Sequence, residues 1–139
     1  MEASKEFVEG RPMPKLDPVS RTFWEATTRN EFLYQECPKC GNRQFYPRAC
    51  CTKCLAEPEW RTSAGTGTIH TFSIVRQNYA QPFRQWVPYA VAVVELDEGP
   101  RVYGNIVGMP VDEIAIGQRV EVEFVATSDE VSFPFWKVV

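Results

Sequence analysis

Apolar and polar residues alternate along the second half of the chain in a pattern that predicts β-strands. After Gly117, apolar side chains point to one side and charged ones to the other, with Val120, Val122 and Phe124 opposed by Arg119, Glu121 and Glu123. Residues 89–96 are apolar on both faces, as in a strand covered on both sides. The predicted strands are residues 68–75, 89–96, 102–107, 119–124 and 135–138.

The first part of the chain predicts an arm followed by one short helix. Residues 1–16 are polar, and Pro12 and Pro14 break any helix, so we expect a loosely ordered arm. Asp17 suits the N-cap and Pro18 the first helical position. One face of this helix is apolar, with Trp24 beside it: Val19, Phe23 and Ala26. We expect this face to pack on its own domain; the alternative is docking on a partner chain.

Five short strands with no strong helix between them predict a mainly β protein. Antiparallel strands of this number and length suit a small barrel such as the five-stranded OB-fold, with an open sandwich as the alternative. The predicted organisation is an N-terminal arm and helix at 1–31, a cysteine module at 32–60 and the barrel at 61–139. The chain ends in an aromatic segment, residues 133–136, which we expect a small barrel to leave partly exposed.

Composition and charge narrow the class of protein. The 139 residues are 44% hydrophobic, which is enough for a core, and the formal net charge of −3 makes nucleic acid an unlikely partner. No apolar run approaches the ~20 residues that cross a bilayer, so no membrane association is expected. The polar, acidic first ten residues do not resemble a signal peptide, so we expect a cytoplasmic protein. In a reducing compartment, closely spaced cysteines indicate metal binding rather than disulfides.

Four of the five cysteines form two C-x-x-C pairs, Cys37 with Cys40 and Cys51 with Cys54. Two such pairs can give four thiolates to one tetrahedral Zn²⁺, and iron in a rubredoxin-like site would use the same ligands. Four sulfur ligands leave no open position, so the ion is predicted to be structural. Gly41 suits the positive φ of such a turn, and we expect the linker to form a hairpin through residues 44–47. Cys50 is interpreted as a spare thiol, because its spacing to Cys54 is three residues.

The segment 76–88 is longer than an ordinary hairpin loop and joins the first two barrel strands. It carries aromatic and cationic side chains: Tyr79, Phe83, Arg84 and Trp86. Together with Trp24, these residues are our candidates for contact with a partner protein, because Trp, Tyr and Arg dominate interface hot spots. Structural packing and direct contact with an acyl-CoA are the alternatives, the latter because such side chains can stack on adenine and pair with phosphate.

No catalytic residue is predicted. His70 is the only histidine, and acid–base chemistry would need a second group beside it, so we interpret it as structural. Four carboxylates in predicted turns are interpreted as solvated: Asp97, Glu98, Asp112 and Glu113. The chain has no phosphate-binding loop, dinucleotide fingerprint, nucleophile elbow or H-E-x-x-H motif.

The order of motifs resembles a known family. The segments that carry the resemblance are Cys37-Pro38-Lys39-Cys40-Gly41, Tyr46-Pro47-Arg48, Cys51-Thr52-Lys53-Cys54, Gly65-Thr66-Gly67-Thr68 and Gly117-Gln118-Arg119-Val120. Over residues 18–136 the chain is similar to small proteins with an N-terminal helix, a rubredoxin-like zinc ribbon and a C-terminal OB-fold, associated with acyl-CoA metabolism. Their members are usually accessory subunits of thiolase-like proteins, which include thiolases, acyltransferases and aldolases.

The resemblance implies a non-catalytic subunit that holds structural zinc and shapes the acyl-CoA site of a thiolase-like partner. The expected assembly is a heteromeric complex around a partner homodimer, acting in C–C bond formation or cleavage. Two other functions stay open from the residues themselves. One is an OB domain that binds single-stranded nucleic acid through its aromatic loop, and the other is a free-standing acyl-CoA carrier.

Overall fold

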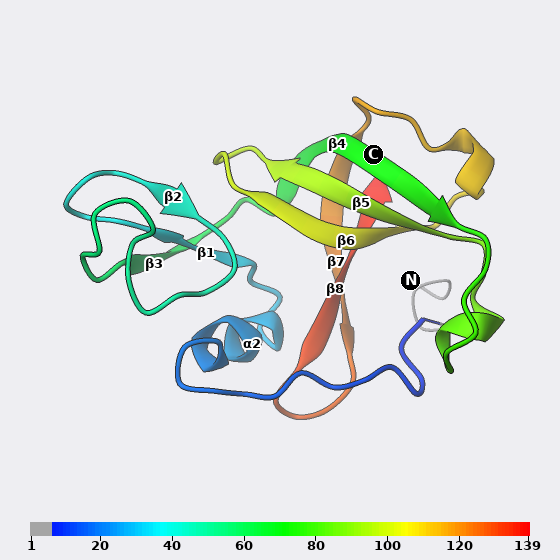
Figure 1. Cartoon of the computed structure of the whole chain (residues 1–139), viewed down its shortest axis with the longest axis horizontal. Helices are drawn as coiled ribbons and strands as arrows, with labels where there is room; N and C mark the ends of the chain where they lie inside the picture. The colour runs from blue at the N-terminus through cyan, green and yellow to red at the C-terminus, as the bar shows by residue number, and fades with distance from the viewer. Residues whose placement is uncertain (1–6) are drawn as a thin grey trace.

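The computed structural model describes residues 7–139, which form a small three-stranded sheet beside a closed barrel, with one helix below their junction (Figure 1). The regular elements are α2 (Arg21–Thr27), β1 (Leu33–Glu36), β2 (Arg43–Gln44), β3 (Glu59–Thr62), β4 (Thr66–Val75), β5 (Tyr89–Leu96), β6 (Arg101–Val107), β7 (Arg119–Ala126) and β8 (Ser132–Val138), with 3-10 turns η1 (Phe83–Gln85) and η2 (Val111–Glu113). The mainly β architecture predicted from the sequence is confirmed.

The barrel has the strand order β4-β5-β6-β8-β7 and closes through pairing of β4 with β7, which excludes the open sandwich. Each predicted strand is present, and β5 has the predicted bounds. One detail differs, because β6 and β8 are parallel, with Ile106 opposite Trp136 and Val107 opposite Lys137. A closed ring with an odd number of strands cannot alternate direction throughout, so one neighbouring pair must be parallel.

The cysteine module is built on a sheet of order β2-β1-β3, in which Gln35 lies opposite Gln44 on one side and Trp60 on the other. The hairpin expected at residues 44–47 is wrong. The chain reverses between Glu36 and Arg43, at the first C-x-x-C pair, so β1 and β2 are the two arms of that turn. The C-x-x-C loop therefore makes the reversal that we had assigned to the linker.

The helix packs largely as its sequence predicts but begins three residues later, at Arg21 with Ser20 as the N-cap, while Asp17 caps the turn before it. Asp17 Oδ1 accepts hydrogen bonds from the backbone N–H groups of Val19 (2.9 Å) and Ser20 (2.7 Å), and the regular helix follows from Arg21. Phe23 and Ala26 are buried. Trp24 is half-buried and packs edge-on against Phe133 of β8, with ring centroids 6.0 Å apart.

The aromatic segment at the end of the chain is buried, so the expected exposed tail is wrong. Phe135 and Trp136 are each 1% exposed, because β8 lies between β6 and β7 in the barrel wall. The Trp136 indole lies over Gly104, where any Cβ would overlap the ring. The absence of a side chain at Gly104 therefore gives this indole its place in the core.

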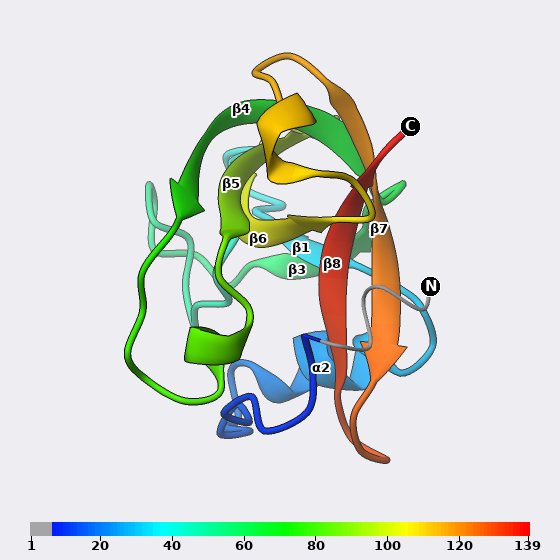
Figure 2. The same cartoon turned by 90° about the vertical axis from the view of Figure 1, so that its right-hand side faces the viewer.

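The described part of the arm, residues 7–16, has no helix or strand, yet it packs on the barrel (Figure 2). Phe7 contacts the rings of Trp86 and Phe135, with centroids 5.7 and 6.4 Å apart. The Arg11 guanidinium lies within 5.1 to 5.6 Å of four ring centroids, those of Phe83, Trp86, Phe133 and Phe135. Contacts of this kind order the arm, contrary to our expectation; residues 1–6 lie outside the described part.

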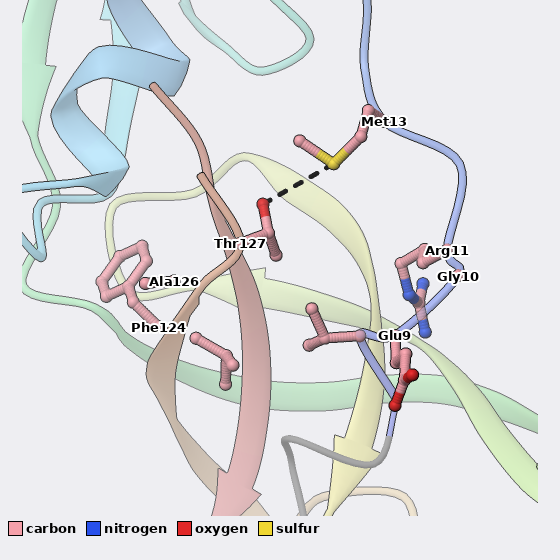
Figure 3. A pocket seen from close by; sticks show the side chains of 9 residues that line it. Glu9, Gly10, Arg11, Met13, Phe124, Ala126 and Thr127 are labelled. Atoms are coloured by element: carbon pink, nitrogen blue, oxygen red, sulfur yellow. Dashed lines mark hydrogen bonds between the residues drawn. The ribbon is translucent and has the colours of Figure 1, made fainter. Parts of the chain in front are cut away.

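Between the arm and the end of β7 lies an open cleft of about 700 Å³ (Figure 3). Met13 spans its rim, where its Sδ accepts a hydrogen bond from Thr127 Oγ1 at 3.6 Å. Glu9 and Arg11 place opposite charges on the arm side of the cleft. The cleft is thus polar in part and bordered by the arm, rather than enclosed by the barrel.

Hydrogen bonds at Glu98 and Tyr46 join the cysteine module, and the linker that follows it, to the barrel. Glu98, in the β5–β6 turn, accepts hydrogen bonds from Ser63 Oγ (2.7 Å) and Ala64 N (2.8 Å) through its carboxylate. Its carbonyl accepts one from Arg43 at 3.1 Å. The Tyr46 hydroxyl accepts a hydrogen bond from the backbone N–H of Tyr103 at 2.9 Å. The orientation of the cysteine module relative to the barrel is therefore specified by side chains.

Candidate metal centre and contact surfaces

The first C-x-x-C turn brings its two sulfurs to one side through backbone hydrogen bonds. Cys37 N donates to Asn42 O at 2.8 Å, and Gly41 N donates to Cys37 O at 2.9 Å. Gly41 has a φ of 78°, a conformation that glycine adopts without steric cost. The Cys40 amide N–H also points at Cys37 Sγ, at an N–S distance of 3.4 Å.

The second turn repeats the two backbone–backbone hydrogen bonds of the first. Cys51 N donates to Ala56 O at 2.7 Å, and Leu55 N donates to Cys51 O at 3.0 Å. Leu55 takes the place of Gly41 and has a φ of 68°, although its branched side chain disfavours that region. The two halves of the module are therefore equivalent in backbone geometry while their sequences differ.

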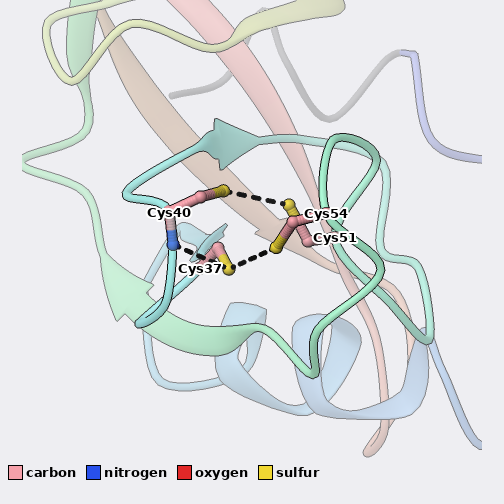
Figure 4. Close-up of side chains that lie close together, drawn as sticks. All are labelled: Cys37, Cys40, Cys51 and Cys54. Atoms are coloured by element: carbon pink, nitrogen blue, oxygen red, sulfur yellow. Dashed lines mark hydrogen bonds between the residues drawn. The ribbon is translucent and has the colours of Figure 1, made fainter.

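These two turns bring the Sγ atoms of Cys37, Cys40, Cys51 and Cys54 within 4.8 Å of one another (Figure 4). The closest pairs join the two turns, Cys37 with Cys54 at 3.4 Å and Cys40 with Cys51 at 3.6 Å. Tetrahedral zinc with Zn–S bonds of about 2.3 Å requires sulfurs about 3.8 Å apart, so the group fits a metal ion. Within residues 7–139 it is the only cluster of at least three such donors, and Cys50 lies outside it.

Backbone amides favour the thiolate form of the first cysteine in each turn. The N–H groups of Cys54 and then Lys53 lower the pKa of Cys51 to about 6, and the N–H of Cys40 lowers the pKa of Cys37. The pKa of Cys54 is raised to about 12: the Ala56 N–H lowers it, but Cys37, burial and the other two thiols outweigh that effect. Four sulfurs this close resist full ionisation, and a bound cation removes that resistance.

Buried amides support the second turn from behind the sulfurs. Gln44 Oε1 accepts hydrogen bonds from the Thr52 backbone N–H (3.0 Å) and from Asn42 Nδ2 (3.2 Å). The Asn42 Nδ2 also points at Cys51 Sγ, at 3.6 Å. Sequence reasoning missed this function of Gln44. The only available signal was a polar residue between the two cysteine pairs, which is common in solvated loops.

The five candidate contact residues lie in two places and are exposed to different extents. In the 76–88 loop, Tyr79 is 73% exposed and Arg84 is exposed, whereas Phe83 is half-buried and Trp86 is buried against Phe7. Trp24 lies on α2 and, within the described residues, makes no ring contact with this loop. The structure therefore does not bring the five residues together into one patch.

Two further polar residues singled out in the sequence, His70 and Asp97, lie on the barrel. His70 is exposed, at the irregular step between Ile69 and Thr71 in β4. Asp97 makes a bidentate ion pair with Arg119, at 2.7 and 2.8 Å, and hydrogen bonds from Arg119 and then Thr66 hold the pKa of this carboxyl well below its usual range.

Two family models match the chain, and they follow one another in sequence. Residues 24–60 match the rubredoxin-like zinc ribbon domain of ChsH2, and residues 60–125 match its C-terminal OB-fold domain. A DUF35 domain-containing scaffold protein of Methanothermobacter thermautotrophicus is 35% identical over 112 residues, covering 79% of this chain and 84% of that protein. The chain therefore belongs to the family of DUF35 proteins, with a ChsH2-type zinc ribbon and OB-fold.

Two further relatives describe the setting in which such chains occur. A probable enoyl-CoA hydratase alpha subunit of Thermomonospora curvata is 30% identical over 91% of this chain, which spans only 40% of that protein's length. A solved structure described as an Ltp2-ChsH2(DUF35) aldolase superposes with a TM-score of 0.80 at 28% identity, covering 91% of this chain and 98% of the matched one. Within residues 7–139 we find no helix long and apolar enough to cross a membrane.

Proposed function

We propose that this chain is a non-catalytic accessory subunit of a thiolase-fold enzyme that acts on acyl-CoA thioesters. In this proposal the partner carries the catalytic groups, and the chain binds a partner homodimer and shapes its active site or acyl-CoA tunnel. The reaction of the complex is formation or cleavage of a carbon–carbon bond, of the thiolase or retro-aldolase type. The observation that carries the proposal is the match to a chain of the solved structure described as an Ltp2-ChsH2(DUF35) aldolase. The match covers 91% of this chain and 98% of the matched one.

The chemistry of the chain supports an accessory function. The best-formed site is a set of four cysteines, and Cys37, Cys40, Cys51 and Cys54 would hold zinc with every coordination position filled by sulfur. Such an ion supplies a cross-link between two turns rather than an activated water. His70 and Asp97 are both exposed, and Asp97 is paired with Arg119. The chain thus offers a stable shape rather than reacting groups.

A direct test is purification of the tagged chain after co-expression with a thiolase-like protein from the same genome. We expect a stable heteromer with one copy of the chain per partner protomer, and carbon–carbon bond turnover only when both proteins are present. Small displacements of catalytic groups are costly, which explains why the second subunit should be needed for turnover. A partner that is fully active alone, or a chain that stays monomeric beside it, would contradict the proposal.

The contact surface is tested separately with Tyr79→Ala and Arg84→Ala, two exposed side chains whose removal leaves the core intact. If the 76–88 loop contacts the partner, we expect each variant to fold normally and bind about tenfold more weakly, as for a moderate hot spot. Arg61→Ala, on the exposed face of β3, is the matched control. Equal affinity in all variants would place the interface elsewhere on the chain.

A further inference from the structure

An apolar cavity of about 310 Å³ lies where α2, the cysteine module and the barrel meet. Its walls include six aromatic rings: Phe23, Trp24, Phe32, Phe45, Tyr46 and Tyr103. Two prolines and Ser20 complete the lining, and no charged side chain contributes to it. At this volume it lies at the lower end of the range of small-molecule sites, about 300–1,000 Å³.

The aromatic rings that line the cavity pack against one another and so hold the cavity's shape without a ligand. Phe23 meets Phe32 and Phe45 nearly edge to face, with centroids 5.3 Å apart in both pairs, so the inner wall is rigid. Tyr103 at the mouth is 67% exposed, so the cavity opens to solvent on the β6 side. A preformed cavity of this kind requires little reorganisation when a ligand enters.

The polar groups at the mouth restrict the ligand further. The Tyr46 hydroxyl already accepts a hydrogen bond from Tyr103 N, so its own proton remains available for an acceptor on a ligand. An ordinary tyrosine already keeps this proton at neutral pH, and burial raises the pKa of Tyr46 further. A matching ligand is therefore an uncharged hydrocarbon compound that carries an oxygen acceptor such as a ketone or ester carbonyl.

One wall of the cavity, residues 45–47, is connected to the metal centre through buried amides. Gln35, 3% exposed, holds both backbone groups of the adjacent Arg48: its Oε1 accepts from Arg48 N and its Nε2 donates to Arg48 O, each at 3.0 Å. Gln44 Nε2 donates to the same Gln35 Oε1 at 2.9 Å, while Gln44 Oε1 holds the second cysteine turn. Two side chains thus join the zinc-binding turn to the cavity wall.

We propose that this aromatic cavity is a binding site for a small uncharged hydrocarbon compound with a carbonyl oxygen, and that Gln35 and Gln44 are positioning residues that make its shape depend on the metal centre. This site is separate from the partner contact proposed above. A subunit with such a site would respond to an apolar metabolite as well as to its partner protein.

The test uses the metal-loaded full chain and the neutral dye 2-acetyl-6-(dimethylamino)naphthalene, whose emission shifts to the blue in apolar surroundings. We expect saturable binding of one dye per chain, displaced by 2-acetylnaphthalene. The matched anion 2-naphthoate should compete at least about tenfold more weakly, because no cation lines the cavity. Equal competition by the anion, or the absence of saturable binding, would overturn the proposal.

Variants locate the dye. Ser20→Phe fills the cavity from the residue that precedes α2, and Tyr103→Ala removes a ring at its mouth. Each should weaken binding about tenfold or more with the circular dichroism unchanged. Tyr79→Ala is the matched control, because Tyr79 is equally exposed and lies outside the cavity. If Tyr103→Ala removes partner binding while no wild-type dye binding is found, the cavity is a protein docking site and the ligand proposal is wrong.

The amide connection is tested with Gln35→Leu, which removes the bonds to Arg48 and leaves all four cysteines in place. We expect one zinc per chain as in the wild type, and dye binding weakened about fivefold in the folded protein. Gln77→Leu, at an exposed glutamine of the 76–88 loop, should change neither. Lower thermal stability with unaltered dye affinity would show that Gln35 is only structural and that the cavity does not depend on the metal centre.

Discussion

The cysteine module and the barrel stay folded by different means. Besides Phe135 and Trp136, the barrel core includes aliphatic side chains that are 0 or 1% exposed: Ile69, Val94, Leu96, Val102 and Val120. The buried residues of the module instead include Gln35, Gln44 and two cysteines, all of which carry polar or metal-binding atoms. Apolar burial stabilises the barrel, whereas directed hydrogen bonds hold the four sulfurs of the module together, where we expect a metal ion to stabilise it.

This difference predicts which substitutions should destabilise each region most. A module that depends on four sulfur atoms is expected to lose its structure in a single step when one of them is lost. A barrel with many interchangeable contacts should respond to changes of volume, and should do so gradually. The following predictions test that division.

The largest effect is expected from loss of the metal. Removing zinc with a chelator, or substituting Cys37→Ser or Cys51→Ser, should unfold residues 33–62, since structural zinc contributes on the order of 10–16 kcal/mol in small zinc modules. The strands of the barrel should survive, because most of the shared buried cluster lies on them and only Phe32 and Leu33 come from the module. Amide hydrogen exchange followed by mass spectrometry should show loss of protection in the module and retention in β4 to β8.

Cys50→Ser is the matched control, because Cys50 lies next to the site in sequence yet outside the sulfur cluster. It should keep one zinc per chain and a normal melting curve. Loss of metal in Cys50→Ser with retention in Cys51→Ser would reverse our assignment of the ligands. Unfolding of the whole chain on chelation would show that the barrel depends on the module.

A smaller but still large effect is expected in the barrel from Gly104→Ala. The added Cβ would overlap the Trp136 indole, so the ring must move out of a filled core, at a cost of about 1–3 kcal/mol. Thermal melting should report the loss, with zinc content unchanged. The double variant Gly104→Ala with Trp136→Leu should lose less than the sum of the two single changes; strict additivity would mean that the ring is not the obstacle.

Within the module, the two equivalent turns predict opposite changes in stability for two reciprocal substitutions, one that introduces glycine and one that removes it. Leu55→Gly relieves a left-handed conformation at a side chain that is 75% exposed, so it should raise stability by up to about 1 kcal/mol. Gly41→Ala imposes the same conformation on a residue with a Cβ and should lower stability by a similar amount. Zinc affinity, measured by competition with a chromogenic chelator, should follow the same order. Parallel responses would contradict the equivalence of the turns.

The smallest effect is expected from the Asp97–Arg119 pair on the barrel surface. Because the folded-state pKa of Asp97 is lowered, its stabilising effect is fully present above the ordinary pKa of an aspartate and is lost as pH falls toward the folded value. Asp97→Asn should therefore lower the melting temperature slightly at pH 7, and the difference from the wild type should shrink progressively as pH falls below the ordinary pKa of an aspartate. A difference that grows as pH falls would contradict this assignment.

Much of the barrel could be predicted because its strands obey simple local rules. The alternation after Gly117 and the two-sided apolar run at 89–96 reflect burial of one or both faces, and the structure has strands at both places. The two cysteine pairs were equally readable, since their spacing follows from the geometry of a tight turn. Local patterns therefore gave the barrel strands and the four clustered cysteines.

What local patterns could not give was the pairing of distant segments. Phe133, Phe135 and Trp136 looked like an exposed tail because nothing nearby in sequence shows that β8 lies between β6 and β7. Gln35 and Gln44 looked like ordinary strand and loop residues, because their partners Arg48 and Thr52 are set by the fold of the module. The aromatic cavity likewise arises from three parts of the fold that are distant in sequence: the helix α2 with Ser20 before it, the cysteine module and the barrel.

The phenol of Tyr46 has a consequence for how the molecule behaves in a crowded solution. Strand β6 pairs with β8 only at Ile106 and Val107, so its first half offers an open edge on that side. Open edges recruit strands from other molecules, and here one edge N–H, that of Tyr103, is already taken by the Tyr46 hydroxyl. Tyr46→Phe would uncover that donor while keeping the ring. We expect such a variant to self-associate at concentrations where the wild type stays dispersed, a change that light scattering would detect.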